Sequence, residues 1–129
     1  MAKFLHDDNS DAALDYIADN GDKLFVCSAQ PTTYAEASST YALADHDLTV
    51  GDGNGDYTIA NGATDGRKVT LAEQATIAID TTGTATHVAI CDSATGKVLA
   101  VFTLSSSASL TSGNTVTVPA LVTTYRDPS

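Results

Sequence analysis

The sequence predicts a mainly β fold: a single-domain antiparallel β-sandwich or flattened barrel with one short N-terminal helix. Three observations favour it. Apolar and polar residues alternate over much of residues 67–126, which is typical of strands with one buried face. Turn residues separate these segments at short intervals, as in sandwiches and barrels. The chain has 129 residues, which suits one domain of the common size, ~100–150 residues.

The N-terminal part predicts the helix, over residues 10–20. Residues 9–11 carry short polar side chains that can accept hydrogen bonds from the free N–H groups of a first turn. Asn20-Gly21 is a natural stop for a helix. Apolar residues at helical spacing form one face, made of Leu14, Ile17 and Ala18.

The middle of the chain is less regular. Residues 24–27 form a continuous apolar run of strand length and predict a buried strand. Pro31 ends this segment, because proline cannot donate to a strand ladder. Residues 35–44 are compatible with either a helical turn or a loop. The glycine-rich loop at 51–56 precedes a further strand segment at 57–60.

The C-terminal part is strongly β. Alternating or apolar segments predict strands around 69–71, 77–79, 86–91 and 115–118, and Pro119 interrupts the last of them. Residues 92–96 have the composition of a hairpin connection. The segment from Lys97 to Leu104 is apolar on both faces, so we expect it to be a central strand.

The expected organisation is a single β-rich domain over 10–126. An N-terminal extension at 1–9 precedes it, and a C-terminal tail at 127–129 follows it. The first eight residues contain no apolar run, so no signal peptide is visible. The longest strictly apolar run is Val98–Phe102, far shorter than the ~20 residues that span a bilayer.

The charge distribution is uneven. The chain carries 16 acidic and 6 basic residues, a net charge of −10, which disfavours nucleic acid and anionic membranes as partners. Between Ser93 and Tyr125 the one charged residue is Lys97. Sheet edges are usually protected by charge, so these strands are either closed within the fold or covered by a partner. The residues expected at such a protein interface are Lys97, Leu99, Val101, Thr115, Thr117 and Tyr125.

One loop has oxygen-bearing side chains at alternate positions, as a calcium loop does: Asp52, Asn54 and Asp56. The rest of the calcium-loop template is missing, because its sixth position is Tyr57 and its twelfth is Ala63. We therefore expect a solvated glycine loop, with calcium binding as the alternative. No cofactor is expected.

Cysteine and histidine give no clear site. Cys27 and Cys91 lie in apolar segments and are expected to be buried free thiols. The alternatives are a disulfide, if their strands are neighbours, and a catalytic pair with His87. The three histidines lack zinc-site spacing, and no catalytic motif is present. No catalytic residues are assigned, and we do not expect an enzyme.

Two stretches carry a resemblance to a known group of proteins. They are GTATHVAICDSATGKVL at 83–99 and SLTSGNTVTVP at 109–119, supported by residues 26–37, 57–60 and 66–70. Together they resemble a widespread group of small tailed-bacteriophage virion structural proteins, which includes decoration and tail-fibre-like β domains. The resemblance covers about residues 10–120 and lies in turns and strand cores. It implies a virion component assembled in the host bacterial cytoplasm, and it carries no catalytic residues.

Our first expectation for function is a non-enzymatic capsid decoration (cement) protein. It would bind the major capsid protein or other virion proteins and form a homo-oligomer in the particle. The short chain without internal repeats favours this over a fibre shaft. One alternative is a tail or neck accessory protein, either a fibre-anchoring adaptor or a small receptor-binding module. Another is a calcium-dependent or carbohydrate-binding module, whose sugar-stacking rings would be Tyr34, Tyr41 and Tyr57.

Overall fold

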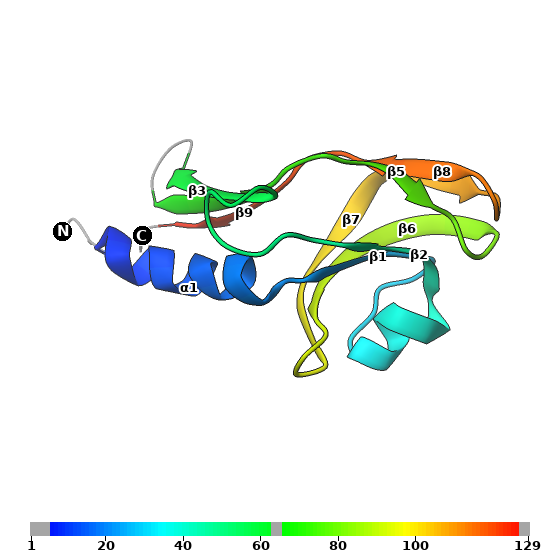
Figure 1. Cartoon of the computed structure of the whole chain (residues 1–129), viewed down its shortest axis with the longest axis horizontal. Helices are drawn as coiled ribbons and strands as arrows, with labels where there is room; N and C mark the ends of the chain where they lie inside the picture. Colours follow the sequence, from blue (N-terminus) through cyan, green and yellow to red (C-terminus); the bar gives the residue numbers. More distant parts are fainter. Residues whose placement is uncertain (1–5, 63–65, 127–129) are drawn as a thin grey trace. The chain divides into compact units, whose positions relative to one another are not determined.

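The computed structural model describes residues 6–62 and 66–126 (Figure 1). Their elements, in chain order, are α1 (Asp7–Asn20), β1 (Lys23–Cys27), the π-helical turn η1 (Glu36–Thr40), β2 (Ala42–Asp47), β3 (Tyr57–Asn61), β4 (Arg67–Leu71), β5 (Gln74–Ala78), β6 (Gly83–Asp92), β7 (Lys97–Leu110), β8 (Thr115–Val118) and β9 (Leu121–Tyr125). The paired strands run antiparallel. The predicted fold class is confirmed: mainly β, antiparallel, with one N-terminal α-helix.

The chain divides into two compact units. The helix unit contains α1, β3, β4 and β9, and the sheet unit contains β1, η1, β2 and β5 to β8. Each unit draws on segments that are far apart in the sequence. No helix within the described residues is both long enough and apolar enough to cross a membrane.

In the helix unit, α1 packs on a three-stranded sheet of order β3-β4-β9. The helix buries Ser10, Leu14 and Ala18, which recur every four residues and so share one face. On β4, Val69 and Leu71 are buried. The predicted helix start at residue 10 is wrong, because α1 begins three residues earlier, at Asp7.

The early helix start has a local cause. The Nδ1 atom of His6 accepts a hydrogen bond from the backbone N–H of Asp8 at 3.1 Å, and the His6 carbonyl accepts one from Asn9 N–H at 3.0 Å. His6 therefore satisfies first-turn donors that we had expected residues 9–11 to cap.

The sheet unit is built on a four-stranded sheet of order β2-β1-β6-β7. One buried cluster of this unit holds Phe25, Cys27, Ala37, Ala89 and Cys91, so it joins β1, η1 and β6. Partly buried side chains from the η1 region and β7 pack against this cluster: Tyr34, Tyr41, Val98 and Val101. A two-stranded ribbon, β5-β8, completes the unit.

The prediction that the strand starting at Lys97 is central is wrong. β7 pairs with β6 alone among the described strands, so it is an edge of its sheet (Figure 1). Its two-sided apolar pattern reflects partial cover on both faces, since residues 98–102 are all half-buried. Cover of the faces does not require a neighbour at the edge, and that is why the pattern misled.

Two other segments differ in detail from expectation. The ambiguous residues 35–44 contain a helical turn, η1, and then the first residues of β2. The strand at 115–118 ends before Pro119 as predicted, and β9, which the sequence did not single out, follows it and pairs with β4. Pro119 thus lies in the connection between the two units.

Candidate interaction surface

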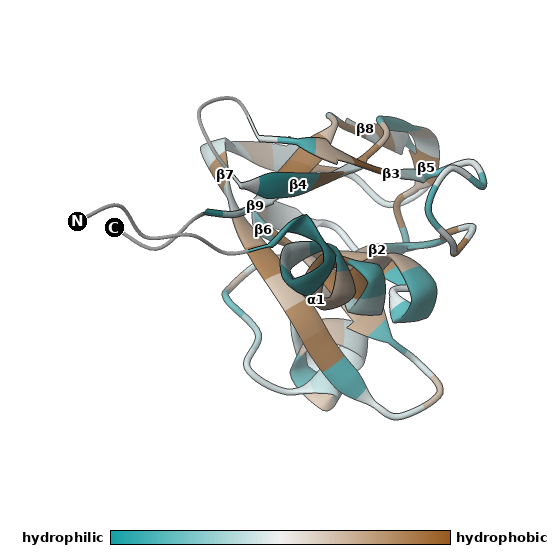
Figure 2. Ribbon diagram, turned by 90° about the vertical axis from the view of Figure 1, so that its left-hand side faces the viewer, coloured by the Kyte–Doolittle hydropathy of each residue, from teal (hydrophilic) through white to brown (hydrophobic). Residues whose placement is uncertain are grey.

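The edge strand β7 carries a run of partly exposed apolar residues. Residues 98–102 are consecutive apolar residues, all half-buried, and no charged residue follows Lys97 within the strand. Figure 2 shows mainly apolar colouring along this strand. Lys97, Leu99 and Val101, three of the predicted interface residues, therefore lie together on one open edge strand.

Two irregularities interrupt the pairing of β7 with β6. Ile90 pairs with Ala100 while Cys91 pairs with Val98, which leaves Leu99 as an extra, bulged residue. A larger irregularity separates Thr103 from Ala108. Regular pairing between the bulges therefore covers residues 100–103.

The opposite edge of the same sheet, β2, is protected. The Leu43 carbonyl accepts hydrogen bonds from the backbone N–H groups of Asp80 at 2.8 Å and Thr81 at 3.0 Å. Ala44 forms an antiparallel bridge with Ile79. Residues 79–81 thus cover part of the β2 edge within the chain.

Charge also protects β2. Lys23 on β1 forms ion pairs with Asp47 and, at 3.9 Å, with Asp45. A hydrogen bond with Asp45, together with burial and repulsion from that carboxylate, raises the pKa of Asp80. Two carboxyl groups from residues far apart in the sequence are therefore close together at this edge.

Two carboxylates fix the connection between β6 and β7. Asp92 accepts hydrogen bonds from Ala94 N–H at 3.0 Å, Thr95 N–H at 3.3 Å and the Thr95 hydroxyl at 2.7 Å. Asp22, just before β1, accepts from Ser93 N–H at 2.9 Å and from the Ser93 hydroxyl. Burial acts to raise the pKa of Asp22, but the Ser93 hydrogen bonds outweigh it and lower that pKa. The Lys97 end of β7 is therefore anchored to its own sheet.

The remaining predicted interface residues lie elsewhere. Thr115 and Thr117 are exposed on β8, in the ribbon with β5. Tyr125 is on β9 in the helix unit and is 46% exposed. The six predicted residues thus belong to three different sheets, and three of them share β7.

The candidate calcium loop uses its polar side chains to bind its own backbone. Asp52 Oδ1 accepts from Ile59 N–H at 2.8 Å, and Asp56 Oδ2 accepts from Thr49 N–H at 2.5 Å. The Asn54 amide donates to the Val50 carbonyl at 3.1 Å. The described residues contain no group of three histidine, cysteine, aspartate or glutamate side chains suited to a metal ion. The hydrogen bonds account for this sequence pattern without a metal.

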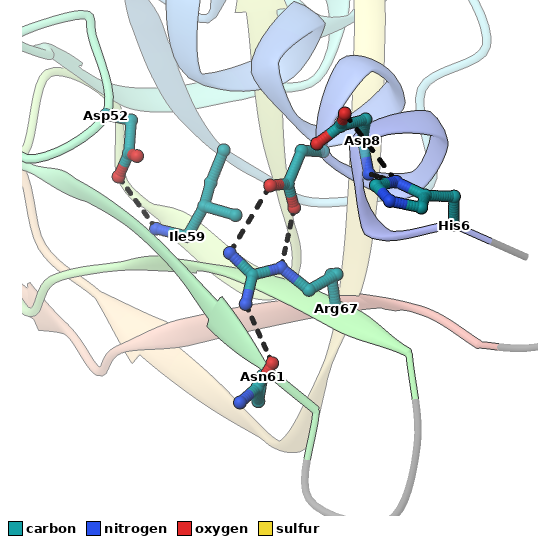
Figure 3. A network of polar contacts seen from close by, with 7 residues as sticks. His6, Asp8, Asp52, Ile59, Asn61 and Arg67 are labelled. Carbon is teal, nitrogen blue, oxygen red and sulfur yellow. Dashed lines mark hydrogen bonds and ion pairs between the residues drawn. The ribbon is translucent and has the colours of Figure 1, made fainter.

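A polar network that the sequence did not predict holds α1 to its sheet (Figure 3). The Arg67 guanidinium donates to both carboxylate oxygens of Asp11, from Nε at 2.7 Å and from Nη2 at 3.3 Å. Its third nitrogen, Nη1, donates to Asn61 Oδ1 at 2.8 Å. This geometry is the bidentate arrangement that arginine favours, and it serves the packing of the helix unit.

The two cysteines are free and buried. Although β1 and β6 are neighbours, Cys27 lies opposite His87 and Cys91 lies opposite Lys23, so the cysteines do not face each other. Burial raises the pKa of Cys27 to about 11, and its thiol lies 3.7 Å from the Ala37 carbonyl, to which it donates. Burial first, and then the nearby Cys27, raise the pKa of Cys91 to about 12. Both environments favour the thiol over the nucleophilic thiolate.

The tyrosines considered for sugar stacking serve as packing residues. Tyr57 is 1% exposed and begins β3 rather than lying in a loop. Tyr34 meets Phe25 edge to face, with ring centroids 5.9 Å apart and an interplanar angle of 81°. Tyr41 packs against the same buried cluster.

No protein-family model, curated protein or solved structure matches the chain.

Proposed function

We propose that the chain is a non-enzymatic structural protein of a tailed-phage particle, namely a capsid decoration protein that binds the major capsid protein. The open, neutral edge of β7 is the observation that supports an assembly role. Proteins that remain monomeric protect long edge strands with charge, proline, bulges or covering segments. From Val98 to Leu110 β7 carries neither charge nor proline, whereas β2 is both charged and covered.

The sequence resemblance supports a role in a phage particle. Two features of the chain favour decoration over the other virion roles. The sequence contains no internal repeat of the kind that builds a fibre shaft. The long neutral strand suits burial against a neighbouring protein, where unpaired charges would be costly.

The abundance of the chain in purified particles tests this proposal. The measurement is quantitative mass spectrometry of virions from an infected culture, with the major capsid protein as the internal standard. A decoration protein should be present in numbers comparable to the capsid protein. About six or twelve copies, the numbers set by tail and neck symmetry, would contradict decoration and favour an adaptor.

A rebinding experiment provides the matched second test. Particles are stripped of the chain under mild denaturing conditions and mixed with the purified protein, and bound protein is measured after sedimentation. We expect saturable rebinding to heads, and no binding to isolated tails. Binding to tails alone would overturn the decoration role.

A further inference from the structure

We propose that β7 pairs antiparallel with β7 of a second copy of this chain across a two-fold axis, which joins two four-stranded sheets into one. The inference rests on the proposed assembly role and identifies what occupies the open edge. It concerns a contact between identical chains and is separate from the contact with the capsid.

The first step is that β7 offers a free edge. A strand at the edge of a sheet presents backbone N–H and C=O groups on the side away from its neighbour. Among the described strands β7 pairs only with β6, and the backbone hydrogen bonds outside the strand pairings involve none of its residues 98–109. Strand addition would satisfy these groups directly.

Head-to-tail pairing of β7 with β2 is disfavoured by the state of the β2 edge. If β7 of one copy paired with β2 of the next, the contact would be head-to-tail and would build a ring or an open filament. The backbone of residues 79–81 already occupies part of the β2 edge, and Asp45 and Asp47 place charge there. The two edges also differ in length, because β2 spans 6 residues and β7 spans 14. Pairing of β7 with β7 of a second copy gives a closed dimer and joins two strands of the same length.

The third step concerns charge. The chain carries a net charge of −10, so two copies repel each other over most approaches. β7 contains no acidic residue, and its one charged residue, Lys97, stands at its end. Antiparallel pairing places the two lysines at opposite ends of the shared ladder. With the axis at the pair formed by the two Val101 residues, each Lys97 lies opposite Ser105 of the second copy, where hydroxyl groups can accept from its ammonium group.

The fourth step is apolar burial. Val98 and Val101 already pack against the buried cluster, and residues 98–102 remain partly exposed. Regular geometry is available at residues 100–103, between the two bulges. Pairing there would add to the burial of these side chains, and the bulges would limit the ladder to a short central segment.

The oligomeric state of the purified full chain tests the inference. Light scattering coupled to size exclusion, over a concentration series, should show a monomer–dimer equilibrium. Thr103→Lys places a charge at an exposed position of the regular segment and should shift the dimer to monomer by at least about tenfold in Kd. This change moves the net charge from −10 to −9, so general repulsion falls and any loss of dimer is local.

Thr111→Lys is the matched control, because Thr111 is exposed but lies beyond the end of β7. It should dimerise like the parent chain. A monomer at every concentration, or a dimer that Thr103→Lys leaves unchanged, would overturn the inference. Neither outcome changes the expected copy number of the chain per particle, which is the test of the proposed function.

Hydrogen exchange on the unsubstituted chain keeps the inference testable if Thr103→Lys misfolds. Amides of residues 98–104 should exchange more slowly at high than at low concentration, while those of β9 should not change. Protection confined to β9, or to the β5-β8 ribbon, would place the contact elsewhere and contradict the proposal.

Discussion

β2 and β7 are the two edge strands of one sheet, and they differ in length, charge and cover. β2 is short, ion-paired through Asp45 and Asp47, and partly covered by the backbone of residues 79–81. β7 is long, neutral beyond Lys97, and interrupted by bulges alone. Protection of an edge is therefore a property of its surroundings: β2 has charge and a covering segment, and β7 has its bulges.

The largest expected effect concerns the cover on β2. Ile79 is 4% exposed and bridges Ala44, so Ile79→Ala should lower the free energy of unfolding by about 2–5 kcal/mol, through lost burial and a cavity. The measurement is urea unfolding. Phe102→Ala, on half-buried β7, is the comparison at a dilution where the chain is monomeric. Its cost should be less than half as large, and equal costs would show that the two edges are held alike.

The next effect concerns the anchor of the β6-β7 connection. Asp22→Ala removes the acceptor of two Ser93 hydrogen bonds and should cost about 1.5–3 kcal/mol near neutral pH. The pKa of Asp22 is lowered from 3.8 in the folded chain. Its contribution is therefore fully present above pH 3.8 and is lost as the pH falls through the folded value.

Thermal melting as a function of pH measures this loss. The difference between the parent chain and Asp22→Ala should shrink as the medium is acidified below pH 3.8. Ser93→Ala should be destabilising as well, and the double variant should cost less than the sum of the two. Additive costs would mean that the two residues do not act as a pair.

The smallest effect has the opposite sign and lies at the β2 edge. Because the pKa of Asp80 is raised from 3.8 in the folded chain, stability falls as the pH rises from 3.8 through the folded value. Asp80→Asn removes this penalty and should stabilise the chain near neutral pH by at most ~1 kcal/mol, since solvent screens the exposed pair. The gain should vanish in acid, and a gain that persists there would point to another cause.

Local sequence patterns predicted where the strands and turns lie better than they predicted which strands pair with one another. The segment at 86–91 and the turn at 92–96 were predictable, because alternation and turn residues act over a few positions. The edge position of β7 was not predictable. It depends on the order of the strands, in which β6 has β1 as its other neighbour, and the residues of β7 do not determine that order. A strand's own residues report which of its faces are covered, and they carry little information about its edges.

The polar contacts were missed for a related reason. Asp22 and Ser93 are 71 positions apart, and Asp11 and Arg67 are 56 apart, so no sequence motif joins them. The helix start was missed because histidine is an uncommon residue before a first turn, and the His6 ring takes that place here. In the candidate calcium loop, the side-chain oxygens were recognised correctly, but their backbone partners are set by folding.

The bulge near the far end of β7 has a practical consequence. β7 advances five residues, from Thr103 to Ala108, where β6 advances two, from Ala85 to His87. Residues 105–107 are exposed serines within this surplus length. Because the ladder already resumes after this surplus, we expect an insertion there to leave the pairing on either side unchanged. The serines at 105–107 are thus a position at which we expect the sheet to tolerate an inserted peptide.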